Sequence, residues 1–445
     1  MLTINKFKLQ ILILIIIGVI RIPASGTGDD TPQDNKNKET DRRFRYGIIP
    51  ALAYDSDLGF RYGAVINIFD YGSNPENYGY EQHLFLRGTN TSTGSLQLQG
   101  LLESNSLISN SLTLVEASYL SEKKYDFYGF NGSNSVYNHL LADKSSTLFR
   151  NSLFYAYERN LLRLRLDNQL RIGDGSFRLL TGVMLNKYEI SPAINSEDNN
   201  NDRPLESETL FKNYIDWGLI SEDEKYGGIV NLFSLGLIYD TRNDLCYCTD
   251  GKWIEAVFIY SPSFLSDNRF ARLVLTYRHH TSIMNDNLTI SFRVSSQQNL
   301  FGKTPFYILS TYYDSRLSQD GIGGAFSLRG ANRNRIVADG FLISNIETKL
   351  KIAEFNLLGQ DFFISTSLFY DNAFVTQSYE IDHRNVPGEV KDFFFNNNSQ
   401  RLHHTAGAGA YIVFNKDNVI SINYGIPFSR HDGHGGLYVG SSLLF

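Results

Sequence analysis

Histidine and acidic residues gather in a few short stretches where they could do chemistry. The segment from His431 to His434 reads HDGH and offers two imidazoles and a carboxylate, which are ligand types for transition metals. The acidic run from Ser196 to Asp202 is similar to a calcium loop but lacks the ligand spacing that such a loop needs. The pairs His279-His280 and His403-His404 have no serine nucleophile motif nearby. Because nothing assembles a catalytic constellation, the sequence predicts no enzyme, no metal site and no cofactor.

Two cysteines, Cys246 and Cys248, are the remaining reactive side chains. A disulfide between residues i and i+2 is strained. Free thiols and an intermolecular contact fit the sequence equally well, so we assign these cysteines no chemistry.

The beginning of the chain has the features of an export signal. An apolar run from Leu9 to Ile20 follows Lys6 and Lys8 and precedes small residues up to Gly26, which predicts a secretory signal peptide over residues 1–26. The alternative, a membrane anchor, is disfavoured because the run is too short to span a bilayer comfortably. Residues 27–43 are polar, charged and without periodicity, which predicts a disordered linker.

Composition narrows the class of protein. The 445 residues include 27 Tyr, 31 Phe and 36 Gly, and the mean hydropathy is slightly negative at −0.24. Such a chain does not form a bundle of transmembrane helices, whereas it suits a membrane barrel whose outward apolar residues alternate with inward polar ones. The net charge of −6 gives no indication of a nucleic-acid partner.

Alternation of apolar and polar residues recurs from Phe44 to the last residue. It is clear in the segments 60–68, 162–167, 288–295 and 345–352. In the last of these, Glu347, Lys349 and Lys351 occupy successive positions on one face. A soluble sandwich rarely turns such charges inward, but a water-filled lumen accepts them. We therefore predict an all-β fold: a transmembrane antiparallel β-barrel over residues 44–445.

The pattern predicts about 16 strands, an even number as bacterial single-chain barrels require. The expected strands are 44–54, 60–69, 80–90, 95–103, 111–121, 148–172, 177–190, 230–241, 252–261, 270–283, 288–298, 341–352, 360–372, 404–414, 418–428 and 437–445. The segment Leu148–Ile172 is too long for one crossing, so it either projects beyond the bilayer or contains a hairpin at Glu158–Asn160. Short turns then alternate with long loops, which places both termini in the periplasm.

A polar, glycine-rich stretch from Gly321 to Gly340 interrupts the strand pattern. Arg329 lies at its centre, while Asp371 shares strand parity with Ser365 and Ser367 and is therefore expected to face the lumen. An arginine folded back against Asp371 would form a charge-assisted, two-point pair. The spacing alone favours the alternative, a solvated loop arginine. Glu347, inward on the adjacent strand, is a second possible partner.

Four stretches, in order along the chain, resemble signatures of one family. They are Gly236–Arg242 followed by Gly251, Ser327–Gly330 with Leu328, Arg329 and Gly330 at its core, Phe369–Ala373, and a terminal strand Leu437–Phe445 that closes on Phe. Together they resemble the bacterial surface antigen (BamA/TamA) family of outer-membrane barrels, over about Phe44 to Phe445. The chain departs from the family pattern at Cys248, where a proline is usual, and at Ala373, where a glycine is usual.

The resemblance implies that the loop folds into the lumen and that Arg329 pairs with an acidic residue of a neighbouring strand. It implies that Tyr438, Leu443 and Phe445 belong to the terminal signal for barrel insertion. Family members carry soluble periplasmic repeats (POTRA domains) before the barrel, and residues 27–43 are too short to form even one.

The resemblance also implies a location in the outer membrane of a Gram-negative bacterium and a role in assembly or insertion there. Pro50 in the first strand and Gly440 in the last suggest a weak seam between these strands, although a bulge that adjusts curvature fits Pro50 equally well. The expected partners are outer-membrane lipids, unfolded outer-membrane proteins and a periplasmic subunit that replaces the repeats. The alternatives are a passive channel or surface receptor controlled by the loop, and an anchor for a soluble partner.

Overall fold

The computed structural model describes residues 43–72, 80–194, 208–244, 247–284, 287–316, 319–357, 360–396, 400–414 and 418–440. Several predictions fall outside these residues. They are the signal peptide 1–26, all of the linker 27–43 except its last residue, Cys246, Leu443 and Phe445.

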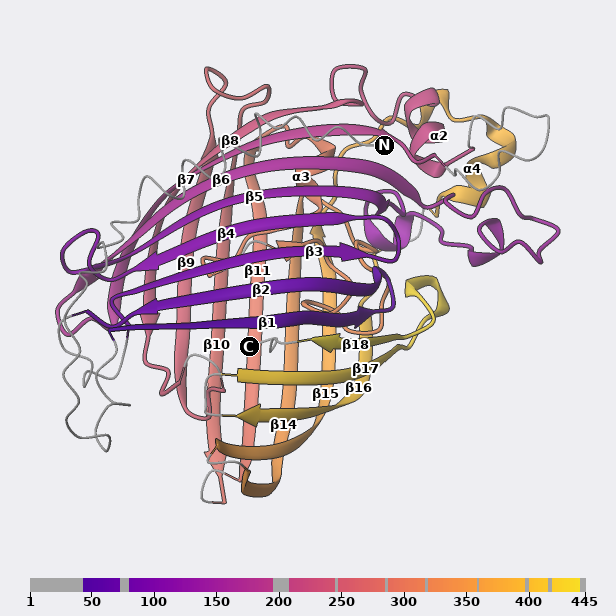
Figure 1. Cartoon of the computed structure of the whole chain (residues 1–445). Helices are drawn as coiled ribbons and strands as arrows, with labels where there is room; N and C mark the ends of the chain where they lie inside the picture. The colour runs from indigo at the N-terminus through magenta and orange to yellow at the C-terminus, as the bar shows by residue number, and fades with distance from the viewer. Residues whose placement is uncertain are drawn as a thin grey trace, which may run out of the picture.

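Sixteen strands of the described chain close into one antiparallel barrel (Figure 1). Their bounds are β1 Phe44–Asp55, β2 Gly59–Asp70, β3 Gln82–Thr91, β4 Leu96–Ser104, β5 Ser111–Asp126, β6 Ala156–Ile172, β7 Phe177–Pro192, β8 Gly227–Asp240, β9 Gly251–Ser261, β10 Phe270–Ile283, β11 Leu288–Gly302, β14 Gly340–Leu357, β15 Gln360–Gln377, β16 His403–Phe414, β17 Asn418–Pro427 and β18 Gly436–Gly440. Each strand pairs with its neighbours in the chain, and β1 closes on β18. The predicted all-β antiparallel barrel is confirmed.

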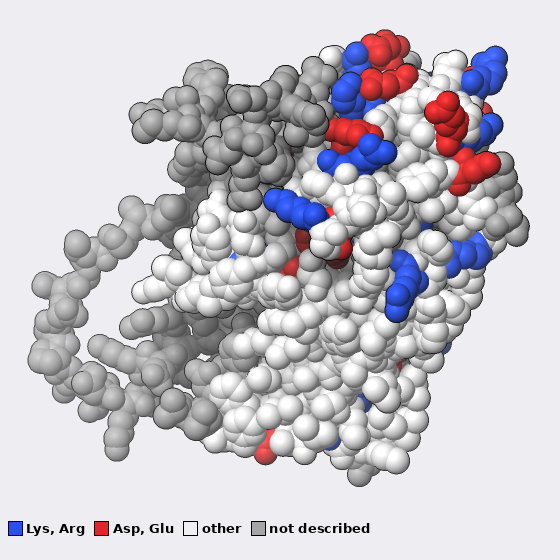
Figure 2. Space-filling model, turned by 90° about the vertical axis from the view of Figure 1, so that its right-hand side faces the viewer, with Lys and Arg blue, Asp and Glu red and all other residues white. Residues whose placement is uncertain are grey.

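The wall follows from the alternation in the sequence. Along β6, the outward Leu162 and Leu166 are exposed, whereas the inward Arg163 and Arg165 are buried. Successive strand residues point to opposite faces, so every strand contributes apolar side chains outside and polar ones inside. Figure 2 shows the result on one face of the molecule: charged side chains gather on its upper part, and the surface below is almost free of them. Such an apolar band is what a lipid bilayer requires.

The predicted strand Leu148–Ile172 is wrong in its first third. The strand β6 begins only at Ala156, and backbone hydrogen bonds from Phe154 to Asn151 and from Ala156 to Leu153 form turns before it. Phe154 is fully buried in the loop core, so its apolar character reflects packing and not a membrane-facing strand. No hairpin occurs at Glu158–Asn160, because these residues pair continuously with β7.

Long connections project from one rim and contain the helical segments. These are η1 Gly132–Asn134, η2 His139–Leu141, α2 Leu210–Asp216, α3 Phe306–Leu309, η4 His383–Asn385, α4 Gly388–Phe394 and η5 Arg430–Asp432. Figure 1 shows α2 and α4 side by side beyond the ends of the strands, and rings of Trp217 and Phe394 from these two connections lie 5.4 Å apart. Among the described residues, no helix has the length and hydropathy needed to cross a membrane.

Aromatic side chains join these long connections into a cap over the barrel. Phe127, Tyr214 and Phe395, from three different connections, pack with ring centroids 5.1 to 5.8 Å apart. The same cluster continues into the lumen through Tyr157 on β6 and Phe306 in α3. Because buried aromatic contacts are strong and specific, the cap and the upper lumen form one packed body.

Candidate functional site

The connection between β11 and β14 folds back inside the barrel. It contains α3, the two-residue strands β12 (Thr311–Tyr312) and β13 (Gln319–Asp320), and then the stretch Gly321–Asp339, which we call the lumen segment. Leu328 and Arg329 are almost completely buried. Leu328 packs in a small apolar cluster with residues of β14 and β15, among them Phe341 and Val375. The segment is therefore held by the barrel wall and not by solvent.

Arg329 makes four hydrogen bonds to two carboxylates. Its Nε donates to Asp371 Oδ2 at 2.9 Å, its Nη2 to Asp371 Oδ1 at 3.0 Å, and its Nη1 to Glu347 Oε2 at 3.1 Å. The backbone N–H of Arg329 also donates to Asp371, at 3.1 Å. The guanidinium carbon lies 3.5 Å from the centroid of the Phe369 ring, a cation–π contact. The structure thus brings Arg329 to both carboxylates that the sequence singled out.

The register of two adjacent strands creates this site. Asp371 on β15 lies directly opposite Asn345 on β14, and Phe369 lies opposite Glu347, so both acids point inward two positions apart. Tyr411 on β16 donates to the other oxygen of Glu347. Burial alone would lower the pKa of Arg329, but the two carboxylates outweigh it and raise the pKa above its ordinary value. The guanidinium therefore remains charged and paired.

Gly330 brings the lumen segment against β17, which lies two strands along the wall from β15. Its φ of +99° suits glycine, and a Cβ there would lie 2.4 Å from the carbonyl carbon of Gly425 on β17. Its backbone N–H donates to the hydroxyl of Tyr438 on β18 at 3.0 Å. Residues 329 and 330 therefore connect β14 and β15 to β17 and β18.

Two further arginines fix the segment to the rest of the barrel. Arg333 donates to Glu122 on β5 at 2.7 Å, and Arg335 donates to the backbone carbonyls of Gly132 and Ser135 at 3.0 and 2.8 Å. A buried guanidinium that binds several fixed acceptors orients the backbone that carries it. The lumen segment is thus an anchored plug.

The histidine-containing stretches make structural contacts in the cap and in the barrel wall. Asp432 accepts from Arg401 at 2.9 Å and contacts His403 Nδ1 at 2.8 Å, while the ring of His434 packs against that of His139. His280 contacts Ser291 across the sheet at 3.0 Å. Within the described residues, no group of three or more His, Cys, Asp or Glu side chains is placed to hold a metal ion.

Asp432 is a charged group of the cap. Burial raises its pKa, but the hydrogen bond and charge of His403, together with Arg335 and Arg401, outweigh burial and lower the pKa below its ordinary value. The carboxylate is therefore stabilised in its charged form.

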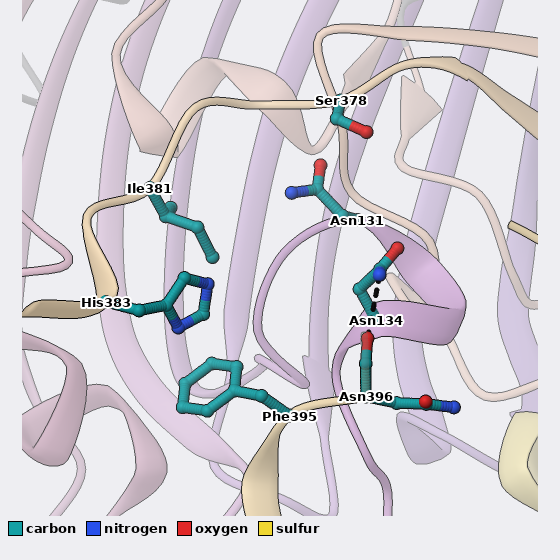
Figure 3. Close-up of a pocket in the computed structure, with 7 residues that line it drawn as sticks. All are labelled: Asn131, Asn134, Ser378, Ile381, His383, Phe395 and Asn396. Carbon is teal, nitrogen blue, oxygen red and sulfur yellow. Dashed lines mark hydrogen bonds between the residues drawn. The ribbon is translucent and has the colours of Figure 1, made fainter. Parts of the chain in front are cut away.

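A cavity of about 120 Å³ lies in the cap, between the connections that follow β5 and β15. Figure 3 shows the residues that line it: Asn131, Asn134, Ser378, Ile381, His383, Phe395 and Asn396. The Asn131 side chain binds the backbone N–H and C=O of Tyr379, and the amide of Asn134 donates to the carbonyl of Asn396 at 2.8 Å. Because these amides hold the two connections together, the cavity is a structural joint of the cap.

The junction of β1 with β18, which we call the seam, carries the remaining predicted residues. Within the described residues, β1 pairs with β18 at two positions, Tyr54 with Val439 and Asp55 with Tyr438. Pro50 faces outward in β1 opposite Ala64 of β2, and a Cβ at Gly440 would meet no atom of the described residues within 4 Å.

Some contacts of the site were not foreseen from the sequence. Tyr438 was placed in a terminal insertion signal, whereas its hydroxyl holds Gly330 inside the lumen. Gly425 and Tyr411 were not singled out. Strand parity could have placed Tyr411 and Tyr438 on the inward face of their strands. No sequence pattern, however, indicates that Tyr411 binds Glu347 or that Tyr438 binds Gly330.

Solved structures of BamA and CdiB resemble this chain in fold. A crystal structure of BamA from Haemophilus ducreyi lacking POTRA domains 1–3 superimposes with a TM-score of 0.54 at 15% identity, covering 89% of this chain and 70% of that chain. CdiB from Escherichia coli superimposes with a TM-score of 0.53 at 10% identity, covering 88% of this chain and 62% of that chain. At these identities the likeness concerns the fold. No sequence profile of a known protein family matches the chain, and no curated protein does.

Proposed function

We propose that the chain is an outer-membrane barrel that assists the assembly or insertion of proteins or lipids in that membrane through a weak seam. The observation that carries this proposal is the contrast between the two edges of the described part of β18. All five described residues of β18 pair with β17, whereas two of these five, Tyr438 and Val439, pair with β1. Ladder hydrogen bonds hold a barrel closed, so over these residues the β1 edge of β18 is easier to open than its β17 edge.

The surface of β1 supports the same proposal. The outward Tyr46 and Ile48 are 78 and 71% exposed, above the 68% of Leu368 on β15, while Leu52 is 62% exposed. Pro50 lies among them and has no N–H to donate to a neighbouring strand. A client strand or a lipid would find an apolar edge there.

The anchored plug counts against a passive channel. The aromatic cap and the buried lumen segment fill the upper barrel, and their release would be needed before ions could pass freely. The location in the outer membrane, the periplasmic termini and a periplasmic subunit that delivers clients belong to this proposal. They are supported by the likeness in fold to BamA and CdiB, which is an argument by analogy.

Folding of a urea-unfolded client barrel into liposomes tests the proposal. The protein is expected to accelerate client folding, and a disulfide between cysteines at positions 54 and 439, which are paired across the seam, is expected to abolish the acceleration. Cys246 and Cys248 are first replaced by serine. Cysteines at positions 52 and 62, paired between β1 and β2, provide the control and leave the acceleration intact.

Two outcomes would overturn the proposal. One is client folding that the protein does not accelerate, together with a large, stable conductance in the same liposomes. The other is equal acceleration with the seam locked.

A further inference from the structure

Arg293 is a buried cation that binds no carboxylate among the described residues. Its side chain on β11 is 0% exposed. Its Nε donates to Asn345 at 2.8 Å and its Nη2 to the carbonyl of Phe326 at 3.0 Å, and both acceptors are neutral. Its Nη1 has no hydrogen-bond partner among the described residues. Burying a guanidinium without a counter-charge is costly, and proteins normally pair such a group or bind an ion to it.

A second arginine faces Arg293 directly. Arg278 on β10 lies opposite it in the sheet, on the same inward face, and is also 0% exposed. Side chains at such positions have Cβ atoms about 5 Å apart, so like charges there repel. The Nη2 of Arg278 donates to Asp314, but its Nε and Nη1 lack partners within the described part of the chain.

The local charges leave an excess of one positive unit. Asp314 is shared, because Arg316 contacts its other oxygen at 3.6 Å. Glu255, the other buried acid beside this group, accepts from Ser315. Three arginines (278, 293 and 316) thus face two carboxylates. Asp371 lies two strands away from Arg293, opposite Asn345, and is already engaged by Arg329.

We infer that the lumen binds a small inorganic anion of the halide class between Arg278 and Arg293. The unpaired Nη1 groups of both arginines donate to it. The buried hydroxyl of Tyr312, which also lacks a partner in the described residues, completes the site; its ring centroid lies 5.9 Å from the Arg293 guanidinium carbon. Charge-assisted donors on side chains that are buried from solvent bind such an anion strongly.

The anion would hold the connection that precedes the lumen segment, which contains Tyr312 and Asp314, against the barrel wall. Asp314 and Tyr312 belong to the connection that leads into the lumen segment, whereas Arg278 and Arg293 belong to the wall. An anion between the two arginines removes their mutual repulsion and allows both to hold this connection. This inference is independent of the proposed function, because it concerns how the plug is retained and not what the seam admits.

Anomalous diffraction tests the site directly. The full chain is refolded and crystallised in sodium bromide, and data are collected at the bromine absorption edge. We expect an anomalous peak within hydrogen-bond distance of the Arg293 Nη1. Electron density there without an anomalous signal would mean ordered water only and would overturn the inference.

Thermal unfolding in detergent micelles tests it in solution. At constant ionic strength, replacing sodium gluconate by sodium chloride is expected to raise the melting temperature in a saturable manner. Arg293→Gln should lose this shift. The matched control is Arg159→Gln on β6, a lumen arginine that is 1% exposed and whose Nε donates to Glu122 at 2.8 Å, and it should retain the shift. An equal chloride shift in Arg293→Gln would overturn the inference, and if that variant fails to fold, the bromide measurement on the unmodified chain decides.

Discussion

Arg329 and Asp371 form a two-point ion pair inside the barrel, with Nε–Oδ2 and Nη2–Oδ1 distances of 2.9 and 3.0 Å. Both side chains are almost completely buried. Removing one partner of a buried pair typically costs about 3–5 kcal/mol, and without Asp371 the guanidinium keeps only its hydrogen bond to Glu347. We therefore expect Asp371→Ala to lower the free energy of unfolding by about that amount, measured by denaturant titration in detergent micelles.

The exposed pair of Arg384 with Asp382 is the matched control for that prediction. Its guanidinium is 88% exposed, and solvent-exposed pairs contribute about 0–1 kcal/mol. Asp382→Ala should therefore leave stability nearly unchanged. Equal effects of the two substitutions would show that the buried pair does not hold the lumen segment.

The geometry of a guanidinium, and not its charge alone, is required at position 329. Lysine keeps the charge but cannot donate to Asp371 and Glu347 together in the fixed fork that the three bonds use. We expect Arg329→Lys to increase proteolysis within the lumen segment, as followed by mass spectrometry of the fragments. Cleavage no faster than in the unmodified chain would contradict this expectation.

Close backbone contact at Gly330 predicts a large effect of a single methyl group. A Cβ there would lie 2.4 Å from Gly425, and the positive φ adds strain. Gly330→Ala should move the segment off β17 and destabilise the barrel by about 1–3 kcal/mol. Gly440→Ala, where a Cβ would meet no atom of the described residues within 4 Å, should change the melting temperature little, and the reverse order would refute the argument.

The barrel architecture could be predicted from the sequence because apolar and polar residues alternate along each strand. Inward Arg165 and outward Leu166 occupy the faces that alternation assigns to them, and the parity of Asp371 placed it in the lumen. Parity cannot foresee contacts between distant segments. The hydrogen bond between Gly330 and Tyr438 joins residues 108 apart, and the burial of Phe154 depends on a cap assembled from several connections.

Acid is expected to weaken the cap through Asp432. Its pKa is lowered in the folded state, so its contribution to stability is present above the unfolded carboxyl value of about 3.9 and is lost as the pH falls through the lower folded value. Hydrogen exchange at the backbone N–H of Asn332, which donates to the carbonyl of Asp432 at 2.7 Å, should accelerate in this range. Asp432→Asn should remove the pH dependence; a dependence that survives would assign it to another group.

Loss of one hydroxyl group should loosen the link between the lumen segment and the seam. In Tyr438→Phe the buried N–H of Gly330 loses its acceptor at 3.0 Å, and an unsatisfied buried donor costs about 1–3 kcal/mol. We expect faster hydrogen exchange at Gly330 and along β18, while β6 and β7 remain unchanged. The control is Tyr424→Phe on β17, whose side chain is 49% exposed on the outer face. If both variants exchange alike, the plug and the seam are independent; if only Tyr438→Phe responds, the plug holds the strand that closes the barrel.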